Sequence, residues 1–144
     1  MTTKTLSAKN FFKQLNSETM SLVDDFYHEN VLFQDPLTIL SGRERLKSYY
    51  INMYKNVISI SWDFSEEVVS GRTTVLFWKM MLTAKDFNGN KPLDLDGVSI
   101  MKVDEKTDKV IYHRDYFDMG AFVYEGIPVL GSVIRFVKQK MKNH

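Results

Sequence analysis

Cysteine is absent from the 144 residues of this chain. The chain can therefore form no disulfide and offers no thiolate for chemistry. The polar N-terminus, residues 1–10, also lacks the apolar stretch of a signal peptide. These two absences suit a reducing compartment, and we expect a cytoplasmic protein.

A large charge of one sign is missing as well. The 19 basic and 18 acidic residues leave a net charge of +1, so the chain has no strong field to attract nucleic acid or an anionic membrane. No apolar run approaches the length of a membrane span. We expect neither nucleic acid nor membrane as a partner.

Motifs for metals and phosphates are lacking too. The three histidines, His28, His113 and His144, do not have the spacing of metal ligands. Gly126 and Gly131 have neither the spacing nor the following lysine of a phosphate-binding loop. We therefore expect no metal and no organic cofactor.

The composition itself is that of a folded globular protein. Hydrophobic residues make up 44% of the chain and charged residues 26%, and no segment is polar or repetitive enough to suggest disorder. A chain of this length removes roughly two thirds of its unfolded surface from water in a single core. We predict one domain that spans residues 1–144.

Helical periodicity dominates the first third of the chain. Apolar residues three and four positions apart predict a helix over residues 7–15, with Ser7 as its N-cap. The same pattern predicts helices over residues 17–27 and 41–55, with a short strand at 31–34 between them.

After residue 57 the hydrophobic period changes to two, which is typical of half-buried strands. Short polar turns divide this region into four predicted strands, at residues 58–69, 73–84, 93–103 and 110–117. Four long strands in succession predict an antiparallel meander, and helices that precede strands predict an α+β fold. An apolar stripe after Pro128 predicts one more helix near the C-terminus.

Two segments carry a resemblance to a known family. The segment His113-Arg114-Asp115-Tyr116-Phe117-Asp118 resembles the last-strand motif of limonene epoxide hydrolase and related SnoaL-like proteins. Residues 11–36, with the pairs Leu15-Asn16 and Asp35-Pro36, are similar to the first helices and strand of ketosteroid isomerase. The resemblance implies a cone: a curved antiparallel sheet packed on the N-terminal helices, a C-terminal helix, an internal pocket, and a homodimer through the convex sheet face.

The resemblance to the epoxide hydrolase implies that Asp115 positions and deprotonates a water molecule. The other functional positions differ, because the tyrosine and asparagine that hold the water are Phe33 and Asp35 here. The Arg-x-Asp pair that orients the base and protonates the epoxide corresponds to Trp78 and Met80. Limonene epoxide hydrolysis is therefore not implied.

The resemblance to ketosteroid isomerase implies that Asp35 is a general base. The tyrosine that stabilises the oxyanion is Phe11 here, and the protonated aspartate beside it corresponds to Ser99. A phenol could come instead from the third predicted helix, which carries Tyr49, Tyr50 and Tyr54.

Together the two comparisons predict a pair of carboxylates, Asp35 and Asp115, in one pocket. Within about 6 Å in an apolar cavity, repulsion and desolvation would raise one pKa above about 3.9 and give a proton-sharing pair. His113, two residues before Asp115 on a strand, points to the same face and could orient the pair or titrate with it. The predicted catalytic residues are thus Asp115, Asp35 and His113. The predicted ligand-binding residues are Phe11, Phe33, Tyr50, Tyr54, Trp78, Met80, Ser99 and Phe117.

Each of these assignments has a structural alternative. Asp35 before Pro36 suits a turn in which the carboxylate accepts backbone N–H groups. A buried Asp115 could instead be neutralised by an arginine of a neighbouring element, Arg43, Arg45 or Arg114. His113 could be a core histidine with satisfied hydrogen bonds, and the tryptophans and methionines could fill the core.

Three functions follow from these alternatives. The first is a cofactor-independent hydrolase, isomerase or cyclase that acts on a small hydrophobic molecule by aspartate acid/base chemistry. The second is a non-catalytic module that binds such a molecule. The third is a dimerisation domain whose cone is filled by bulky side chains. The first two separate on one geometric observation, whether Asp35 and Asp115 face each other across an open cavity.

Overall fold

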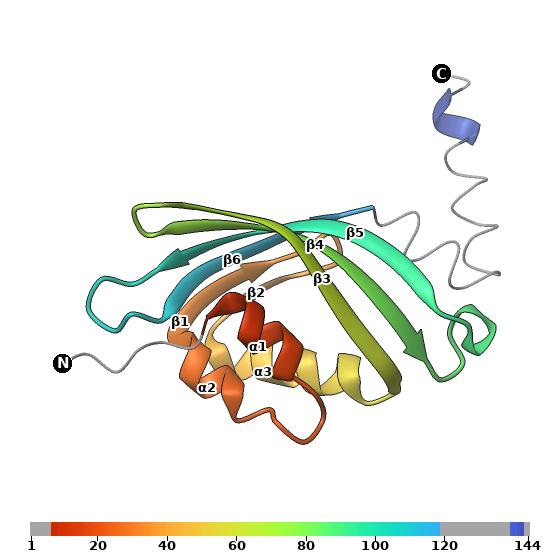
Figure 1. Cartoon of the computed structure of the whole chain (residues 1–144), viewed down its shortest axis with the longest axis horizontal. Coiled ribbons are helices and arrows are strands. Elements are labelled where there is room, and N and C mark those ends of the chain that lie inside the picture. Colours follow the sequence, from red (N-terminus) through yellow and green to blue (C-terminus); the bar gives the residue numbers. More distant parts are fainter. Residues whose placement is uncertain (1–6, 119–138, 143–144) are drawn as a thin grey trace.

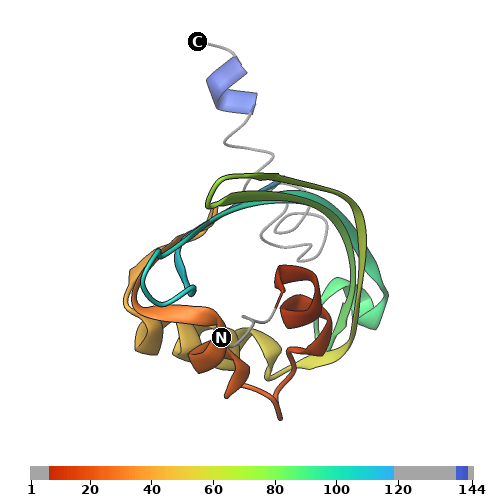
Figure 2. The ribbon, with the colours of Figure 1, turned by 60° about the vertical axis from the view of Figure 1, so that its left-hand side comes forward.

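A computed structural model describes residues 7–118 and 139–142 and confirms the predicted α+β fold. A long curved sheet arches over three short helices, which lie on its concave side (Figures 1 and 2). In chain order the elements are α1 Ala8–Gln14, α2 Leu22–Phe26, β1 Tyr27–Gln34, β2 Ile39–Ser41, α3 Arg43–Tyr54, β3 Val57–Ser70, β4 Thr73–Ala84, the 3-10 turn η1 Asn88–Asn90, β5 Leu93–Val103 and β6 Val110–Phe117.

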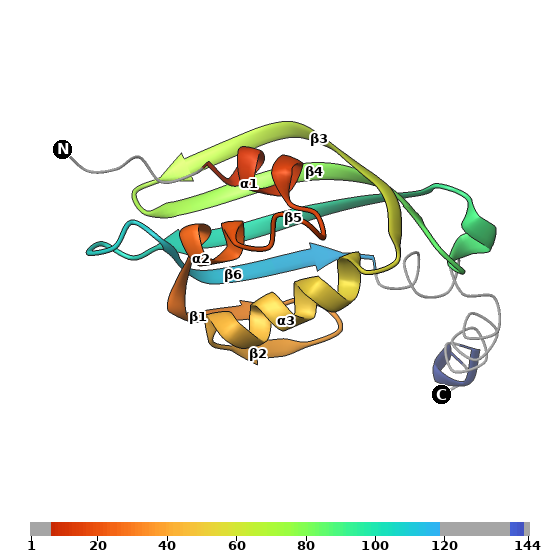
Figure 3. The same cartoon turned by 90° about the horizontal axis from the view of Figure 1, so that it is seen from below.

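The six strands form one sheet in the order β2-β1-β6-β5-β4-β3 (Figure 3). Strands β3 to β6 are consecutive antiparallel neighbours, so the predicted meander is confirmed. Strand β1 pairs with β6 in parallel, which the sequence pattern did not predict. This parallel pair brings the first and last strands of the described chain side by side at the site described below.

The alternation of side chains along β4 sets the two faces of the sheet. Leu76, Trp78, Met80 and Leu82 are buried on the concave face, as their period of two predicts. The concave face packs against the helices, with α1 against β3 and α3 against β1. Ser7 caps α1 as predicted, because its side chain accepts the N–H of Asn10.

The predicted second helix, residues 17–27, is wrong in length. Helix α2 is confined to Leu22–Phe26, because side chains hold the preceding residues in a turn. The Asn16 side chain accepts the N–H of Glu18 at 2.8 Å, and the Thr19 hydroxyl donates to the carbonyl of Gln14 at 2.8 Å. Tyr27 consequently begins β1, four residues earlier than the predicted strand.

A hairpin that the sequence did not predict follows β1. The Asp35 carboxylate accepts the N–H groups of Leu37 and Thr38, and the N–H of Asp35 donates to the carbonyl of Thr38. These bonds reverse the chain into the short strand β2.

Residues 139–142 are helical, whereas the predicted turn at 120–124 and the start of the helix after Pro128 lie outside the described residues.

Candidate functional site

An apolar cavity of about 270 Å³ lies between the helices and the concave face of β3 and β4. Its walls combine side chains from α1, α3, the three strands β3, β4 and β6, and the adjoining connections: Phe12, Tyr50, Met53, Tyr54, Asn56, Val57, Ile60, Trp62, Met80, Leu82, Ala84, Lys85, Phe87 and Asp115. Asp115 is the only carboxylate among these lining residues.

Asp115 lines the cavity, and neighbouring side chains hold one of its two carboxylate oxygens. Its Oδ1 atom accepts a hydrogen bond from the Ser99 hydroxyl at 2.5 Å and lies 2.6 Å from Nε2 of His113. No described residue donates a hydrogen bond to its Oδ2 atom, and the side chain keeps 19% of its surface exposed. Two neighbours therefore fix the carboxylate and leave Oδ2 available to a bound molecule.

Ser99 is held in turn by Trp78. Ser99 pairs with Asp115 across β5 and β6 and is almost fully buried. The indole Nε1 of Trp78 donates to the Ser99 oxygen at 2.9 Å. Because an indole nitrogen can only donate, the serine accepts from Trp78 and directs its own proton to Asp115.

His113 is completely buried and lies in a cage of rings. Its ring stacks on Tyr27, with 5.8 Å between centroids, and meets Phe12 and Phe33 edge-on. Nδ1 of His113 lies 2.7 Å from the Tyr27 hydroxyl, which lies 2.8 Å from the Tyr50 hydroxyl. A continuous chain of hydrogen bonds thus runs from Tyr50 through Tyr27 and His113 to Asp115.

The phenols around the cavity are held in their neutral form. Burial raises the pKa of Tyr27 and of Tyr50 well above the ordinary value. Burial, followed by the negative charge of Asp115, also raises the pKa of Tyr54. No described residue hydrogen-bonds to the Tyr54 hydroxyl, so its proton is available to a molecule in the cavity.

The structure does not join the carboxylate of Asp35 to that of Asp115. Asp35 follows Gln34, which pairs with Arg114, so the two aspartates occupy neighbouring strand positions. However, the Asp35 carboxylate accepts the two N–H groups of its turn and the Tyr49 hydroxyl at 2.5 Å, and it does not line the cavity. Burial and the bond to Asp35 raise the pKa of Tyr49. This geometry is that of a turn in which the Asp35 carboxylate accepts backbone N–H groups, the structural alternative stated for Asp35 in the sequence analysis.

The other predicted site residues fall into three groups. Tyr50, Tyr54 and Met80 line the cavity together with Asp115. Trp78, Ser99 and His113 stand behind Asp115 as its direct or indirect hydrogen-bond partners. The remaining three, Phe11, Phe33 and Phe117, do not line it, since Phe11 and Phe33 are core residues and Phe117 packs near Trp78.

Two aromatic wall residues, Phe12 and Trp62, were not predicted as ligand contacts. Their apolar periodicity identifies them as inward-facing, but it does not separate core from cavity wall. The Nε1 atom of Trp62 is buried and has no hydrogen-bond partner among the described residues. The sequence missed Tyr27 as a site residue because its pattern continued the predicted second helix.

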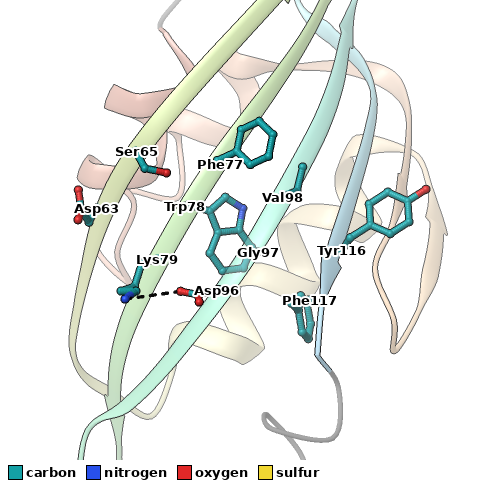
Figure 4. Close-up of a pocket in the computed structure, with 10 residues that line it drawn as sticks. All are labelled: Asp63, Ser65, Phe77, Trp78, Lys79, Asp96, Gly97, Val98, Tyr116 and Phe117. Carbon is teal, nitrogen blue, oxygen red and sulfur yellow. Dashed lines mark ion pairs between the residues drawn. The ribbon is translucent and has the colours of Figure 1, made fainter.

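A second, more open hollow of about 710 Å³ crosses the convex face of the sheet (Figure 4). Phe77, Val98 and Tyr116 contribute apolar surface, and Lys79 forms an exposed ion pair with Asp96 at 3.9 Å. Gly97, which has no side chain, lies between the side chains that line the hollow. This hollow does not include Asp115, so we place the candidate site in the concave cavity.

The part of the chain that the structure describes contains no cluster of three or more histidine or acidic side chains placed to hold a metal ion. None of its helices has the length and apolar character needed to cross a bilayer.

A curved, unclosed sheet that encloses a cavity against a few helices, with a carboxylate on the last described strand, defines the cone-shaped class of α+β proteins. The family model described as the SnoaL-like domain matches residues 8–113, and the chain belongs to this family. None of the curated proteins matches the chain in sequence.

Solved structures share this fold at low sequence identity. One is a protein from Shewanella denitrificans that is described, by inference, as a SnoaL-like polyketide cyclase. It is 16% identical, with a TM-score of 0.69 over 79% of this chain and 89% of that chain. An LEH-like epoxide hydrolase from M. tuberculosis is 16% identical, with a TM-score of 0.61 over 75% and 77%. A hypothetical protein with a ketosteroid isomerase-like fold from Catenulispora acidiphila, in complex with trimethylamine, is 10% identical, with a TM-score of 0.67 over 81% and 87%. At these identities the likeness establishes the fold and leaves the reaction open.

Proposed function

We propose that this protein is a cofactor-independent enzyme in which Asp115 takes a proton from a small, mostly apolar molecule. The observation that carries the proposal is the position of Asp115, which lines an apolar cavity while Ser99 and His113 hold its Oδ1 atom and no described residue donates to Oδ2. A fixed carboxylate in an environment with little water is a well-oriented base.

The size of the cavity limits the molecule. An apolar cavity of about 150 Å³ is enough for benzene, whereas this cavity measures about 270 Å³. Aromatic and aliphatic side chains supply most of the wall, and the polar groups that meet it include Asp115 and Tyr54. These dimensions fit a compound with one or two rings and a single polar group.

Proton removal from carbon next to a carbonyl group suits this arrangement better than attack by water. A phenol of the cavity wall, Tyr50 or Tyr54, can donate a hydrogen bond to the oxygen on which negative charge develops. The cyclase and isomerase-like relatives are consistent with such chemistry. Attack by water in the epoxide hydrolase relies on an arginine and an aspartate. The resemblance places these two at the positions of Trp78 and Met80, so this chain lacks those polar groups.

The exchange of carbon-bound hydrogen for deuterium tests this proposal directly. We expect the protein to accelerate the exchange of the α-hydrogens of 2-indanone, a small bicyclic ketone, in D₂O, as followed by NMR. Asp115→Asn keeps the size of the side chain but removes the base, and should lower the rate by about 10²- to 10⁴-fold. An unchanged rate in a folded Asp115→Asn protein would overturn the assignment of the base.

A non-catalytic binding module is the second candidate. The positions that supply catalytic polar groups in related enzymes are apolar here at Phe11, Phe33 and Met80, which favours binding without chemistry. In this case 2-indanone would bind, with equal affinity for the native protein and for Asp115→Asn, and its α-hydrogens would exchange no faster than in buffer.

We also propose a homodimer through the convex sheet face. No described helix covers this face, which carries partly or largely exposed apolar side chains at Val75, Phe77, Met81 and Tyr116. Phe77→Glu places a charge at the centre of this surface and should convert a dimer into a monomer in light-scattering measurements.

The cytoplasmic location expected from the sequence stays a prediction.

A further inference from the structure

Tyr50 and Asp115 are the two ends of one chain of hydrogen bonds, and both ends line the same cavity. The two internal members, Tyr27 and His113, are fully buried and do not line the cavity. The cavity therefore meets the same hydrogen-bond chain at two points, a carboxylate and a phenol.

The direction of the chain follows from the number of protons that each group carries. An ionised Asp115 only accepts, so Nε2–H of His113 donates to it. If His113 carries this single proton, its Nδ1 atom accepts from the Tyr27 hydroxyl. Tyr27 has no second proton, so the Tyr50 hydroxyl donates to Tyr27 and offers only oxygen lone pairs to the cavity.

One additional proton on His113 reverses part of the chain. Nδ1–H then donates to the Tyr27 oxygen, and the Tyr27 hydroxyl donates to the Tyr50 oxygen. The Tyr50 hydroxyl becomes free to donate into the cavity. The rings packed on His113 from α1 and β1 are those of Phe12, Phe33 and Tyr27, and burial keeps the Tyr27 phenol neutral by raising its pKa. Among the described residues, Asp115 is therefore the charged partner of His113.

We propose that Tyr50 is the catalytic acid that complements Asp115, and that Tyr27 and His113 are positioning residues that supply its proton. This inference rests on the proposed function and deepens it by naming the acid of the same site and the source of its proton. In a bound carbonyl compound, the carbonyl oxygen would lie toward Tyr50 and the reacting carbon toward Oδ2 of Asp115.

The step balances without any other reactant. Oδ2 of Asp115 takes the proton from the α-carbon, and the C–H electron pair forms a carbon–carbon double bond. The carbonyl oxygen takes the Tyr50 proton, Tyr50 takes the proton of Tyr27, and Tyr27 takes the proton on Nδ1 of His113. The product is the enol, Asp115 ends protonated, and His113 ends neutral with its proton on Nε2.

Single and double variants test the relay in the exchange reaction of 2-indanone. Tyr27→Phe and Tyr50→Phe should each slow the exchange by about 10- to 100-fold. The double variant should be no slower than the slower single variant, because both changes interrupt one chain. Tyr112→Phe removes a hydroxyl from the opposite face of β6 and should leave the rate unchanged.

The solvent isotope effect gives a reading that a merely structural role would not change. A step in which several protons move together gives a curved dependence of rate on the deuterium fraction of the solvent. Tyr27→Phe should make this dependence linear. In nitrogen-15 NMR spectra of the unliganded protein at high pH, Nε2 of His113 should carry the proton and Nδ1 should not.

The outcomes separate the relay from the proposed function. Full activity in folded Tyr27→Phe and Tyr50→Phe, together with an inactive Asp115→Asn, would overturn the relay and leave Asp115 as the base. A native protein that does not accelerate the exchange would overturn both. If Tyr27→Phe does not fold, a linear isotope dependence in the native protein, or a proton on Nδ1 instead of Nε2, would still overturn the relay.

Discussion

The indole of Trp78 occupies the space that a side chain at Gly97 would need. The two residues pair across β4 and β5, and a Cβ atom at position 97 would lie 2.2 Å from two carbons of the indole ring. The missing side chain allows the indole to lie over β5 and reach Ser99, two residues further along that strand. Gly97 thereby helps to determine how Asp115 is held.

Gly97→Ala should displace the indole and break its hydrogen bond to Ser99. Overpacking of a tightly filled site costs about 1–3 kcal/mol, and we expect a loss of this size in the free energy of unfolding, measured with urea. Trp78→Phe makes room for the added methyl group, so the double variant should lose less than the sum of the single changes. Strict additivity would contradict the contact.

Asp35 should matter for stability more than for catalysis. Asp35→Ala removes the acceptor of two backbone N–H groups and of the Tyr49 hydroxyl, and should cost about 1–3 kcal/mol. Asp35→Asn keeps an oxygen for the turn and should cost less. Both variants should retain most of the 2-indanone exchange that Asp115→Asn loses.

A folded Asp35→Asn protein without exchange activity would instead support the two-carboxylate hypothesis from the sequence. Circular dichroism and the urea midpoint would establish that the variant is folded. The comparison is fair because Asp35 and Asp115 undergo the same chemical substitution at neighbouring strand positions.

The sequence predicted β4, β5 and β6 with their observed bounds, because alternation of apolar and polar residues repeats clearly along each strand. The parallel pairing of β1 with β6 was not predictable in the same way, since no local pattern encodes a partner so distant in the chain. Alternation also placed His113 and Asp115 on one face, whereas the helical assignment of Tyr27 concealed its contact with His113.

Closing the cavity should weaken binding without disturbing the hydrogen-bond chain. Ala84 lines the cavity at the end of β4, and Ala84→Leu would place three more carbons inside it. We expect the affinity for 2-indanone, measured by calorimetry, to fall at least tenfold. Thr83→Leu adds a large side chain at the adjacent, alternate-face position and is the matched control. Equal effects of the two changes would place the ligand elsewhere.

The buried phenols make stability fall at alkaline pH. Burial raises the pKa of Tyr27 and Tyr50, and burial together with Asp115 raises that of Tyr54. The unfolded chain ionises its tyrosines near pH 10, so above this pH it binds fewer protons than the folded state. The contribution of each phenol is complete below about pH 10 and should decline by about 1.4 kcal/mol per pH unit above it.

Urea unfolding between pH 8 and about pH 11.5, with tyrosine ionisation followed by ultraviolet absorbance, measures this decline. The tyrosine absorbance should change together with unfolding, because the folded state keeps these hydroxyls protonated. Tyr54→Phe removes one of the three groups and should reduce the slope above pH 10 by about 1.4 kcal/mol per pH unit. A native protein whose three buried phenols ionise near pH 10 without loss of stability would contradict the enclosed hydrogen-bond chain between Tyr50 and Asp115.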